Sequence, residues 1–510
     1  MNQRPTTIRI GRALWERVLD HHLADGKRVE ALSYVWARCE RTMGGLVVLI
    51  PSKAPYFAFQ ADCYERQSSG NVRLRPDVLN GMLVEFAGSD YNCVVNIHDH
   101  WFAQHGVFSA VDDEDDARFD TYLHERFEPM LALHPGIGPC RPIFNLSLVV
   151  GQQTTGARMT GGHRLNSRVD RMTIADEKWR EVSLSHAVRS NARPMQADVH
   201  LRHQSFITAQ VQNSLAHLTV GIVGCGGLGS ILAETLGRLG IRRFRLIDDD
   251  RLGTSNLNRW QGARPGDVGR RKTELLGKML RDQFPGCDVR TVSRPMSHGN
   301  STAAIAGSDV VFGCVDNDAA RWHLNHVALQ FMVPYFDAGV SVVAGPPVEL
   351  STRYFAVLPE ATGCVDCKGI DLLDREEVLA AFISPEIAAE RRNAGYVLDR
   401  PETPAASAYM LNQRAASLLA MEFCNFMTGW RSTATVAYEN WNAWAAKRLD
   451  RDTFPEHPAD GCPVCGIRTG AGYSLALPRP TGGIRIDPLD FSRARASETA
   501  VSNRRSAKKK

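Results

Sequence analysis

The chain has 510 residues and a formal net charge of +4, and 44% of its residues are hydrophobic and 23% charged. These values are typical of a globular protein with two or three domains, and they argue against a nucleic-acid partner. No apolar run reaches the roughly 18 residues that cross a membrane, and the residues after Met1 lack the apolar core of a signal peptide, so we expect no membrane association.

We expect residues 1–170 to form a first α/β domain. Its predicted elements are, in chain order, a helix over Leu14–Glu30, strands over Leu46–Ile50 and Cys93–His100, an acidic helix over Asp112–Phe127 and a strand over Phe144–Val150. The composition then shifts towards Gly, Thr, Arg and Ser, and we interpret residues 171–200 as a linker.

A second α/β domain is predicted over residues 201–476. Its predicted elements include the strand Leu218–Val223, the helix Ser230–Leu239 and the strands Phe244–Ile247, Val310–Phe312 and Pro334–Phe336. Continuous apolar strands are typical of a buried parallel sheet, and a strand, helix and strand in succession indicate a Rossmann-like fold. Residues 477–510 contain little that could pack and end in a basic run, so we expect a disordered tail.

Three potential metal ligands lie close together in the first domain. His98 and His100 alternate on a predicted strand, so their side chains point to one face of the sheet. Asp112, in the first turn of the next predicted helix, can supply a third ligand. Two histidines and one carboxylate leave one position of a tetrahedral Zn²⁺ open, which is the arrangement of a catalytic site that activates water.

This pattern resembles the JAB/JAMM metalloprotease family, whose signature is a glutamate, then HxH, then SxxD. The resemblance implies that Glu30 is the general base, with Glu40 as the alternative, and that Ser109 stabilises the oxyanion. The chain departs from the family in the slightly longer spacing from His100 to Ser109 and in Trp101, which replaces a proline.

A glycine-rich motif, GCGGLG, spans Gly224–Gly229 between a predicted strand and a predicted helix. Glycines let the backbone approach a phosphate, and the helix N-terminus offers free N–H groups. Dehydrogenases share such a motif, so further features are needed. Asp248 ends the next strand and is placed to accept hydrogen bonds from ribose hydroxyls, and Asp316, in GCVDN, ends another strand.

Together with SNLNRW and Lys272, these motifs resemble the ThiF/MoeB/ubiquitin-activating family over about half of the chain. Arg259 follows Asp248 by 11 residues and Lys272 follows Arg259 by 13, as in the family's pattern. The resemblance implies that ATP is bound by Gly224, Gly226, Gly227, Gly229, Asp248, Asn256, Arg259, Lys272 and Asp316.

The same resemblance implies the roles of these residues. Asp248 would hold the ribose, Arg259 and Lys272 would neutralise the triphosphate, and Asp316 would position Mg²⁺. Arg202 matches an arginine that reaches the γ-phosphate across a homodimer, although it stands slightly closer to the glycine motif than is usual in the family. A substrate carboxylate would attack the α-phosphate, a reaction that depends on positioning and on cationic stabilisation of the transition state.

Twelve cysteines are present, and four of them form the pairs Cys364-Val-Asp-Cys367 and Cys462-Pro-Val-Cys465. Two such pairs offer four thiolates to Zn²⁺ and leave no open position, so we predict a structural zinc site in a reducing, cytoplasmic compartment. The same family brackets its crossover region with such distant pairs. A redox-active pair is the alternative, although neither pair opens a predicted helix.

Many family members pass the acyl group to a cysteine between the zinc-binding pairs, just before a helix. No cysteine stands there in this chain, because Cys424 falls inside the predicted helix, and Cys225 and Cys314 border the nucleotide motifs. The adenylate would then be passed to sulfide, a persulfide or a partner's cysteine, unless one of these cysteines is used in an unusual way.

The two resemblances imply a JAB/JAMM-like α/β domain followed by a Rossmann-like ThiF-type adenylation domain with a Cys₄ zinc site. The second domain would adenylate the C-terminal glycine of a ubiquitin-like or sulfur-carrier protein, and the first would cleave peptide or isopeptide bonds beside that glycine. A homodimer and a ubiquitin-conjugating-type partner are implied. The alternatives are sulfur transfer through a thiocarboxylate and a first domain that only docks the modifier. Similar fusions occur in bacterial ubiquitin-like conjugation systems, some of them linked to phage defence.

Overall fold

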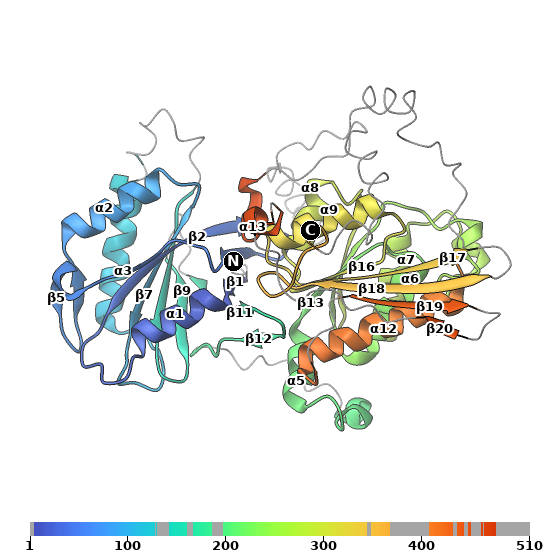
Figure 1. Cartoon of the computed structure of the whole chain (residues 1–510), viewed down its shortest axis with the longest axis horizontal. Helices are drawn as coiled ribbons and strands as arrows, with labels where there is room; N and C mark the ends of the chain where they lie inside the picture. Colours follow the sequence, from blue (N-terminus) through green and yellow to red (C-terminus); the bar gives the residue numbers. More distant parts are fainter. Residues whose placement is uncertain are drawn as a thin grey trace, which may run out of the picture.

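A computed structural model describes residues 5–127, 129, 142–160, 167–185, 197–343, 348–367, 407–431, 436–442, 447–449, 461–462 and 464–475. Two sheets lie side by side along the long axis of the molecule, each covered by its own helices (Figure 1). Among the described residues, no helix combines the length and the apolar character needed to span a bilayer.

The first sheet has ten strands in the order β10-β9-β8-β7-β2-β3-β1-β11-β12, with β4 also paired to β2. Its strands are β1 (Thr6–Gly11), β2 (Leu32–Arg41), β3 (Leu46–Ile50), β4 (Tyr56–Ala58), β7 (Cys93–Asp99), β8 (Phe144–Val150), β9 (Thr155–Met159), β10 (Ser167–Arg168), β11 (Arg171–Ala175) and β12 (Arg180–Glu181). A two-stranded sheet, β5 (Tyr64–Gln67) and β6 (Val72–Leu74), lies beside it, after the short helix η1 (Ala61–Cys63).

Helices cover both faces of the first sheet, namely α1 (Arg12–His22), α2 (Pro76–Ala87) and α3 (Ala110–Tyr122), which runs on into a π-helical turn over Leu123–Phe127. Every residue of β7 and β8 is buried, and successive residues enter different cores. Val95 packs in the core that contains α1, whereas Val94 packs in the core that contains α2. His98 therefore shares the face of Val94, and Asp99 points to the face of α1.

The predicted strands Leu46–Ile50 and Phe144–Val150 are confirmed with the same bounds. The predicted helix over Leu14–Glu30 is wrong beyond His22, because Gly26 adopts a φ of 79°, outside the helical region. The Lys27 ammonium also donates to the carbonyl of His22 over 3.1 Å, which satisfies the end of the helix.

Residues 171–175, assigned above to the linker, form strand β11 of the first sheet. This strand pairs in parallel with β1, with Thr7 opposite Arg171 and Gly11 opposite Ala175. Residues 186–196 of the predicted linker and the predicted tail 477–510 lie outside the described residues. The boundaries of the two domains stay predictions.

The second sheet has eight strands in the order β15-β14-β13-β16-β17-β18-β19-β20. They are β13 (Thr219–Val223), β14 (Arg243–Ile247), β15 (Asp288–Val292), β16 (Val310–Gly313), β17 (Tyr335–Val343), β18 (Glu349–Val357), β19 (Val436–Asn442) and β20 (Lys447–Leu449). The strands from β15 to β17 are parallel and the pairs from β17 to β20 antiparallel. The expected Rossmann-like fold is confirmed, and the structure adds the strand order, with β13 between β14 and β16.

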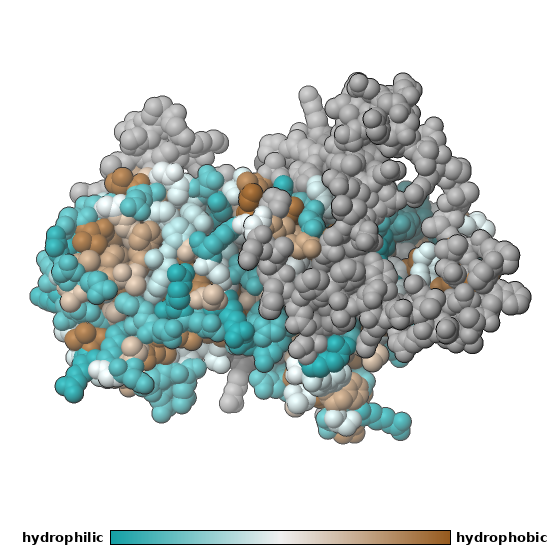
Figure 2. All heavy atoms as spheres, viewed as in Figure 1, coloured by the Kyte–Doolittle hydropathy of each residue, from teal (hydrophilic) through white to brown (hydrophobic). Residues whose placement is uncertain are grey.

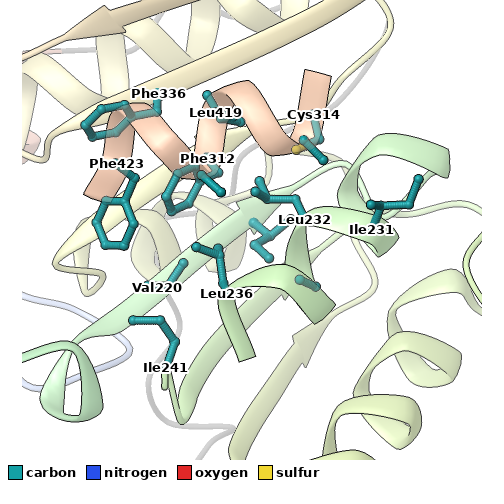
Figure 3. Packing of buried hydrophobic residues seen from close by; sticks show 14 of the residues in the cluster. Val220, Ile231, Leu232, Leu236, Ile241, Phe312, Cys314, Phe336, Leu419 and Phe423 are labelled. Carbon is teal, nitrogen blue, oxygen red and sulfur yellow. The ribbon is translucent and has the colours of Figure 1, made fainter. Parts of the chain in front are cut away.

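The described helices of the second domain are α5 (Ala209–His217), α6 (Gly227–Leu239), α7 (Lys272–Gln283), α8 (Gly299–Ala306), α9 (Asp318–Gln330), α12 (Tyr409–Thr428) and α13 (Cys465–Arg468). Short turns of 3₁₀ helix are η3 (Ala197–His203), η4 (Thr254–Asn256), η5 (Pro265–Asp267) and η7 (Gly472–Ser474). Helices α6 and α12 pack together on one face, where Leu236 and Phe423 meet Phe312 of the sheet (Figure 3). Helices α8 and α9 bury apolar residues in a separate core.

The first sheet packs directly against the second domain. Val47 and Leu49 of β3 are buried in the same apolar core as α8 and α9. The buried guanidinium of Arg9 donates to the carbonyls of Phe331 and Ser308 over 2.5 and 2.6 Å, and Arg171 pairs with Asp309 over 2.5 Å. A shared core and buried ionic contacts hold the two domains in one arrangement.

Candidate functional site

The carboxyl ends of β13 and β16 open into one cavity of about 820 Å³. The strand order reverses between these two strands, and this is where α/β sheets bind ligands. The GCGGLG motif follows β13. Its first glycine, Gly224, has a φ of 90°, and a Cβ there would lie 2.5 Å from the carbonyl oxygen of Cys314. Only glycine fits this turn.

Two contacts fix the glycine motif in place. The Asp248 carboxylate accepts a hydrogen bond of 2.7 Å from the backbone N–H of Cys225, and the Trp260 indole donates to the carbonyl of the same residue over 2.8 Å. Helix α6 then begins at Gly227, and no side chain caps it at Gly226. Its free N–H groups therefore face the cavity as an anion site.

Most residues with a predicted ATP contact line this cavity: Gly224, Gly226, Gly227, Asp248, Asn256, Arg259, Lys272 and Asp316. Gly229 does not, because it packs against the carbonyl of Gly224 inside the turn. Lys272 is the first residue of α7 and its ammonium lies 2.6 Å from Asp250. Burial alone would lower the pKa of Lys272, but Asp248, Asp250 and Asp316 together raise it, so the ammonium stays charged.

Arg202 is not among the residues that line the cavity of its own chain. It lies in η3, next to the exposed side chains of Val199 and Leu201. This segment precedes α5 and projects from the second domain, where apolar surface is visible (Figures 1 and 2). The structure does not bring Arg202 together with the other predicted residues within one chain.

Sequence reasoning missed several polar residues of the cavity, among them Arg321 and Asn412. Arg321 is held by Asp318 over 2.7 Å and by Asp337 over 2.9 Å. The Asn412 amide nitrogen lies 2.5 Å from the place where a Cβ of Gly227 would stand. Arg321 could have been suspected, because it lies one helical turn after Asp318, which directly follows the GCVDN segment. Asn412 carries no such signal.

The four paired cysteines form one cluster, as predicted. The Sγ–Sγ distances are 3.7 Å for Cys364–Cys367, 3.8 Å for Cys364–Cys462 and 3.5 Å for Cys367–Cys465. Four ligands at the Zn–S length of about 2.3 Å would lie about 3.8 Å apart, so the cluster fits a tetrahedral Zn²⁺. The pKa of Cys465 falls to about 5 because Cys364, and then the other two thiols, donate to its sulfur.

Cys465 opens the short helix α13, so the expectation that neither cysteine pair opens a helix is wrong. The convergence of all four sulfur atoms favours a metal site over a redox pair. The first pair is tied to α9, where Asn325 accepts a hydrogen bond of 3.2 Å from the N–H of Val365. The cluster therefore links the segment that follows β18 to α9.

The ligands predicted in the first domain also converge. Nε2 of His98 lies 3.0 Å from Oδ1 of Asp112, and Nε2 of His100 lies 3.7 Å from Oδ2. Ligands at about 2.0 to 2.1 Å from a tetrahedral Zn²⁺ lie about 3.3 Å apart, so these separations fit. Nε2 of His98 is buried, and the carboxylate that lies against it belongs to Asp112, itself one of the three potential ligands.

The sequence matches the model of the ThiF family over residues 199–464, more than half of its length. The chain belongs to the ThiF family. The match covers the glycine motif, the cavity and Cys364, Cys367 and Cys462, while residues before 199 lie outside it. The second domain is thus a ThiF domain with a four-cysteine cluster.

Curated relatives align with this ThiF-family chain over about a third of its length. Ubiquitin-like modifier-activating enzyme 5 of Dictyostelium discoideum is 30% identical over 33% of the chain and 49% of its own length. SAMP-activating enzyme E1 of Haloferax volcanii is 30% identical over 32% of the chain and 63% of its own length. The tRNA threonylcarbamoyladenosine dehydratase 2 of Saccharomyces cerevisiae is 27% identical over 37% of the chain and 47% of its own length. The chain spans about half the length of the curated relatives it matches.

Among solved structures, Escherichia coli MccB with MccA-N7isoASN superposes with a TM-score of 0.42. The sequence identity is 21%, and the superposition covers 54% of this chain and 76% of that chain.

Glu30 of the ThiF-family chain lies just before β2 and is only 5% exposed. Burial raises the pKa of its carboxyl to about 7, with His98 opposing and Asp99 and Asp112 adding to the rise. Glu40 lies at the other end of β2, where it accepts a hydrogen bond of 3.0 Å from the N–H of Tyr473. Of the two candidate bases, Glu30 is therefore the one beside the histidines.

Asp99, between the two histidines, is a further residue that sequence reasoning missed. It is fully buried, and its Oδ2 accepts from Lys27 over 2.6 Å and from the N–H of Ala31 over 3.1 Å. Nδ1 of His22 lies 2.8 Å from the same oxygen. Asp99 thus fastens the loop that carries Glu30 onto β7. Ser109 caps α3, since its Oγ accepts from the N–H of Asp112.

Glu30→Gln is expected to change how stability depends on pH. The unfolded carboxyl ionises near 4.5, whereas the folded one keeps its proton up to about 7, so the wild type loses stability as the pH rises through this window. The free energy of unfolding of Glu30→Gln, relative to that of wild type, should rise by about 1 to 2 kcal/mol as the pH is raised from 4 to 8. Urea unfolding in metal-free buffer measures this, with the exposed Glu65→Gln as control. A pH-independent difference would contradict the burial of an ionisable Glu30.

Proposed function

We propose that the second domain uses ATP to adenylate the C-terminal carboxylate of a ubiquitin-like or sulfur-carrier protein. Membership in the ThiF family supports this activity, and the printed names of two relatives, a ubiquitin-like modifier-activating enzyme and a SAMP-activating enzyme, support the substrate class. The observation that carries the proposal is the single cavity in which the free end of α6, Asp248, Lys272 and Asp316 meet.

In this proposal each group has a task set by its charge. The N-terminus of α6 binds a phosphate, Asp248 accepts from the ribose, and Lys272 with Arg259 balances the negative charge that develops on the phosphates. A carboxylate oxygen of the substrate forms a bond to the α-phosphorus, while the bond to the bridging oxygen breaks and pyrophosphate leaves. No proton has to move, so no general base is needed.

Asp316 is the residue that would hold Mg²⁺. Its carboxylate is exposed and lines the cavity, and within the described part of the chain its hydrogen bond is a weak one, from the Asn317 amide at 3.4 Å. An exposed carboxylate of this kind suits Mg²⁺, which prefers oxygen ligands. When bound, the ion would neutralise phosphate charge.

The acceptor of the acyl group is proposed to come from outside this chain. Between the two cysteine pairs the sequence contains one cysteine, Cys424, which is buried in α12 and whose pKa burial raises to about 11. Cys225 and Cys314 are buried as well, and burial raises their pKa further. None of these thiols is an exposed nucleophile. We therefore propose transfer to sulfide, a persulfide or the cysteine of a ubiquitin-conjugating-type partner.

ATP–pyrophosphate exchange tests the adenylation. Exchange should require a ubiquitin-like protein with a free C-terminal glycine, because that carboxylate is the nucleophile, and the same protein with an amidated C-terminus should not support it. Equal exchange with both would contradict the proposed substrate. A gain of mass on the carrier that corresponds to sulfur in place of oxygen would favour the sulfur-carrier form of the reaction.

We also propose that the first domain is a zinc peptidase of the JAB/JAMM type that acts beside the same glycine. The supporting observation is the convergence of His98, His100 and Asp112, with Glu30 nearby. When bound, Zn²⁺ would polarise the scissile carbonyl and a water. Glu30, whose pKa of about 7 suits proton transfer, would take the proton from that water and give it to the leaving amine.

His98→Ala should abolish cleavage of a ubiquitin-like protein fused at its C-terminal glycine to a reporter. The exposed His105→Ala should leave cleavage unchanged, because His105 lies outside the ligand set. Cleavage that survives in His98→Ala would contradict the peptidase and favour a domain that only docks the modifier. Gel analysis of the fusion over time measures the difference.

The homodimer is likewise a proposal. Arg202 stands on an exposed segment with apolar neighbours and away from the cavity of its own chain. In a homodimer, Val199 and Leu201 would be buried against the second copy, and Arg202 would reach the cavity of that second copy.

A further inference from the structure

Helix α3 supplies Asp112 to the proposed metal site, yet none of its residues is fully buried. Only Phe119 and Tyr122, in its second half, pack against an apolar core. The first half reads AVDDEDD, and its carboxylates repel one another. Apolar packing therefore does not explain what holds the start of α3, and with it Asp112, against the sheet.

One side chain from the neighbouring sheet supplies the missing contacts. Arg158 of β9 forms ion pairs with Asp113 and, over 2.5 Å, with Asp116. Its guanidinium donates to the main-chain carbonyl of Asp112 over 3.1 Å and stacks on Phe108, 3.8 Å from the ring centroid. One of these contacts is to Asp112 itself, and the others are to residues before and after it in the chain.

The other side of the arrangement is anchored to the strands below. Oδ1 of Asp116 accepts a hydrogen bond of 2.6 Å from Ser147 of β8 and one of 3.4 Å from Asn96 of β7. Asn96 lies two residues before His98, on the same face of the strand. The ion pair between Arg158 and Asp116 thus connects the helix that bears Asp112 to the strand that bears the histidines.

We propose that Arg158 is a positioning residue that holds Asp112 within coordination distance of His98 and His100. The inference rests on the proposed metal site of the first domain. The planar guanidinium satisfies Asp116 and the carbonyl of Asp112 at once, which an ammonium cannot do in the same geometry. Without it, none of the described arginine or lysine side chains of the sheet pairs with the acidic start of α3, and Asp112 loses its fixed distance to the histidines.

Metal titration of the full chain tests this. Wild-type protein should bind two Co²⁺ per chain, one at the cysteines with the intense thiolate absorption and one at the histidines without it. In Arg158→Met the second binding event should weaken about 10- to 100-fold, the range for loss of a supporting contact behind a metal ligand. The thiolate band should stay as in wild type.

Arg118→Met is the matched control. Arg118 lies on α3 itself and is 67% exposed, and among the described residues it pairs only with Glu114 and Asp115, so its loss should leave both binding events unchanged. Arg158→Lys keeps the charge and should give an intermediate affinity. Equal affinity in Arg158→Met and wild type would overturn the role of Arg158. A wild type that binds Co²⁺ only at the cysteines would overturn the metal site itself, and the inference with it.

Discussion

Lys272→Ala is expected to lower the affinity for ATP by about 100-fold or more, because it removes a buried cation from a cavity lined by carboxylates. The Lys272 side chain is only 11% exposed, and its ammonium lies among Asp248, Asp250 and Asp316. A triphosphate that enters the variant would meet these acids with one cation fewer to offset their charge, although Arg259 remains. The adenylation rate should fall with the affinity.

Calorimetric titration with ATP and with adenosine measures this effect. Adenosine carries no phosphate, so its affinity should change little, and the comparison isolates the phosphate contact. Lys278→Ala is the control, since Lys278 lies on the same helix α7, 61% exposed, and pairs with Asp282. Equal ATP affinity in Lys272→Ala and wild type would mean that the triphosphate does not lie against α7.

Cys465→Ser is expected to lower the apparent melting temperature by about 10 °C or more. Structural zinc contributes folding free energy directly, and a loss of a few kcal/mol shifts the melting of domains of this size by that amount. The residues after Cys465 also contact the first domain, since Lys53 donates to the carbonyl of Ile467 over 3.2 Å and Glu40 holds Tyr473. Helix α13 lies between the two domains (Figure 1).

Loss of the cluster should therefore loosen the contact between the domains as well as destabilise the fold. Limited proteolysis should separate a first-domain fragment in Cys465→Ser but not in wild type. Cys287→Ser, which changes a half-buried cysteine outside the cluster, should preserve both the melting temperature and the resistance to proteolysis. A Cys465→Ser protein as stable as wild type would contradict a structural metal at these four cysteines.

Local patterns in the sequence were sufficient for several of the buried strands and for the motifs that follow them. Leu46–Ile50 is a short apolar run, and its burial on both faces follows from that composition. In Phe144–Val150 the apolar residues are interrupted by Asn145 and Ser147, which are buried through hydrogen bonds to Asn96 and Asp116. The four cysteines and the His98, His100 and Asp112 set were found because spacing fixes which side chains share a face. The glycine motif was recognised because its conformational demands leave few alternatives.

Contacts between distant segments could not be predicted in this way. Strand β11 is positioned by its pairing with β1, more than 160 residues earlier in the chain. Its own sequence does not stand out from the polar stretch around it. Arg158 and Asp99 act through partners 42 and 72 residues away, and no local pattern marks them. The choice between Glu30 and Glu40 likewise depended on which end of β2 lies beside the histidines at the end of β7.

The most direct test of the central claim, adenylation in the ThiF domain, is ATP–pyrophosphate exchange by wild type and Asp316→Ala with the same ubiquitin-like protein that ends in a free glycine. Asp282→Ala, which changes an exposed acid on α7, serves as the control. Wild type and Asp282→Ala should catalyse exchange, and Asp316→Ala should fall to the background without protein substrate. Exchange that persists in Asp316→Ala, or that is absent from wild type, would contradict the account.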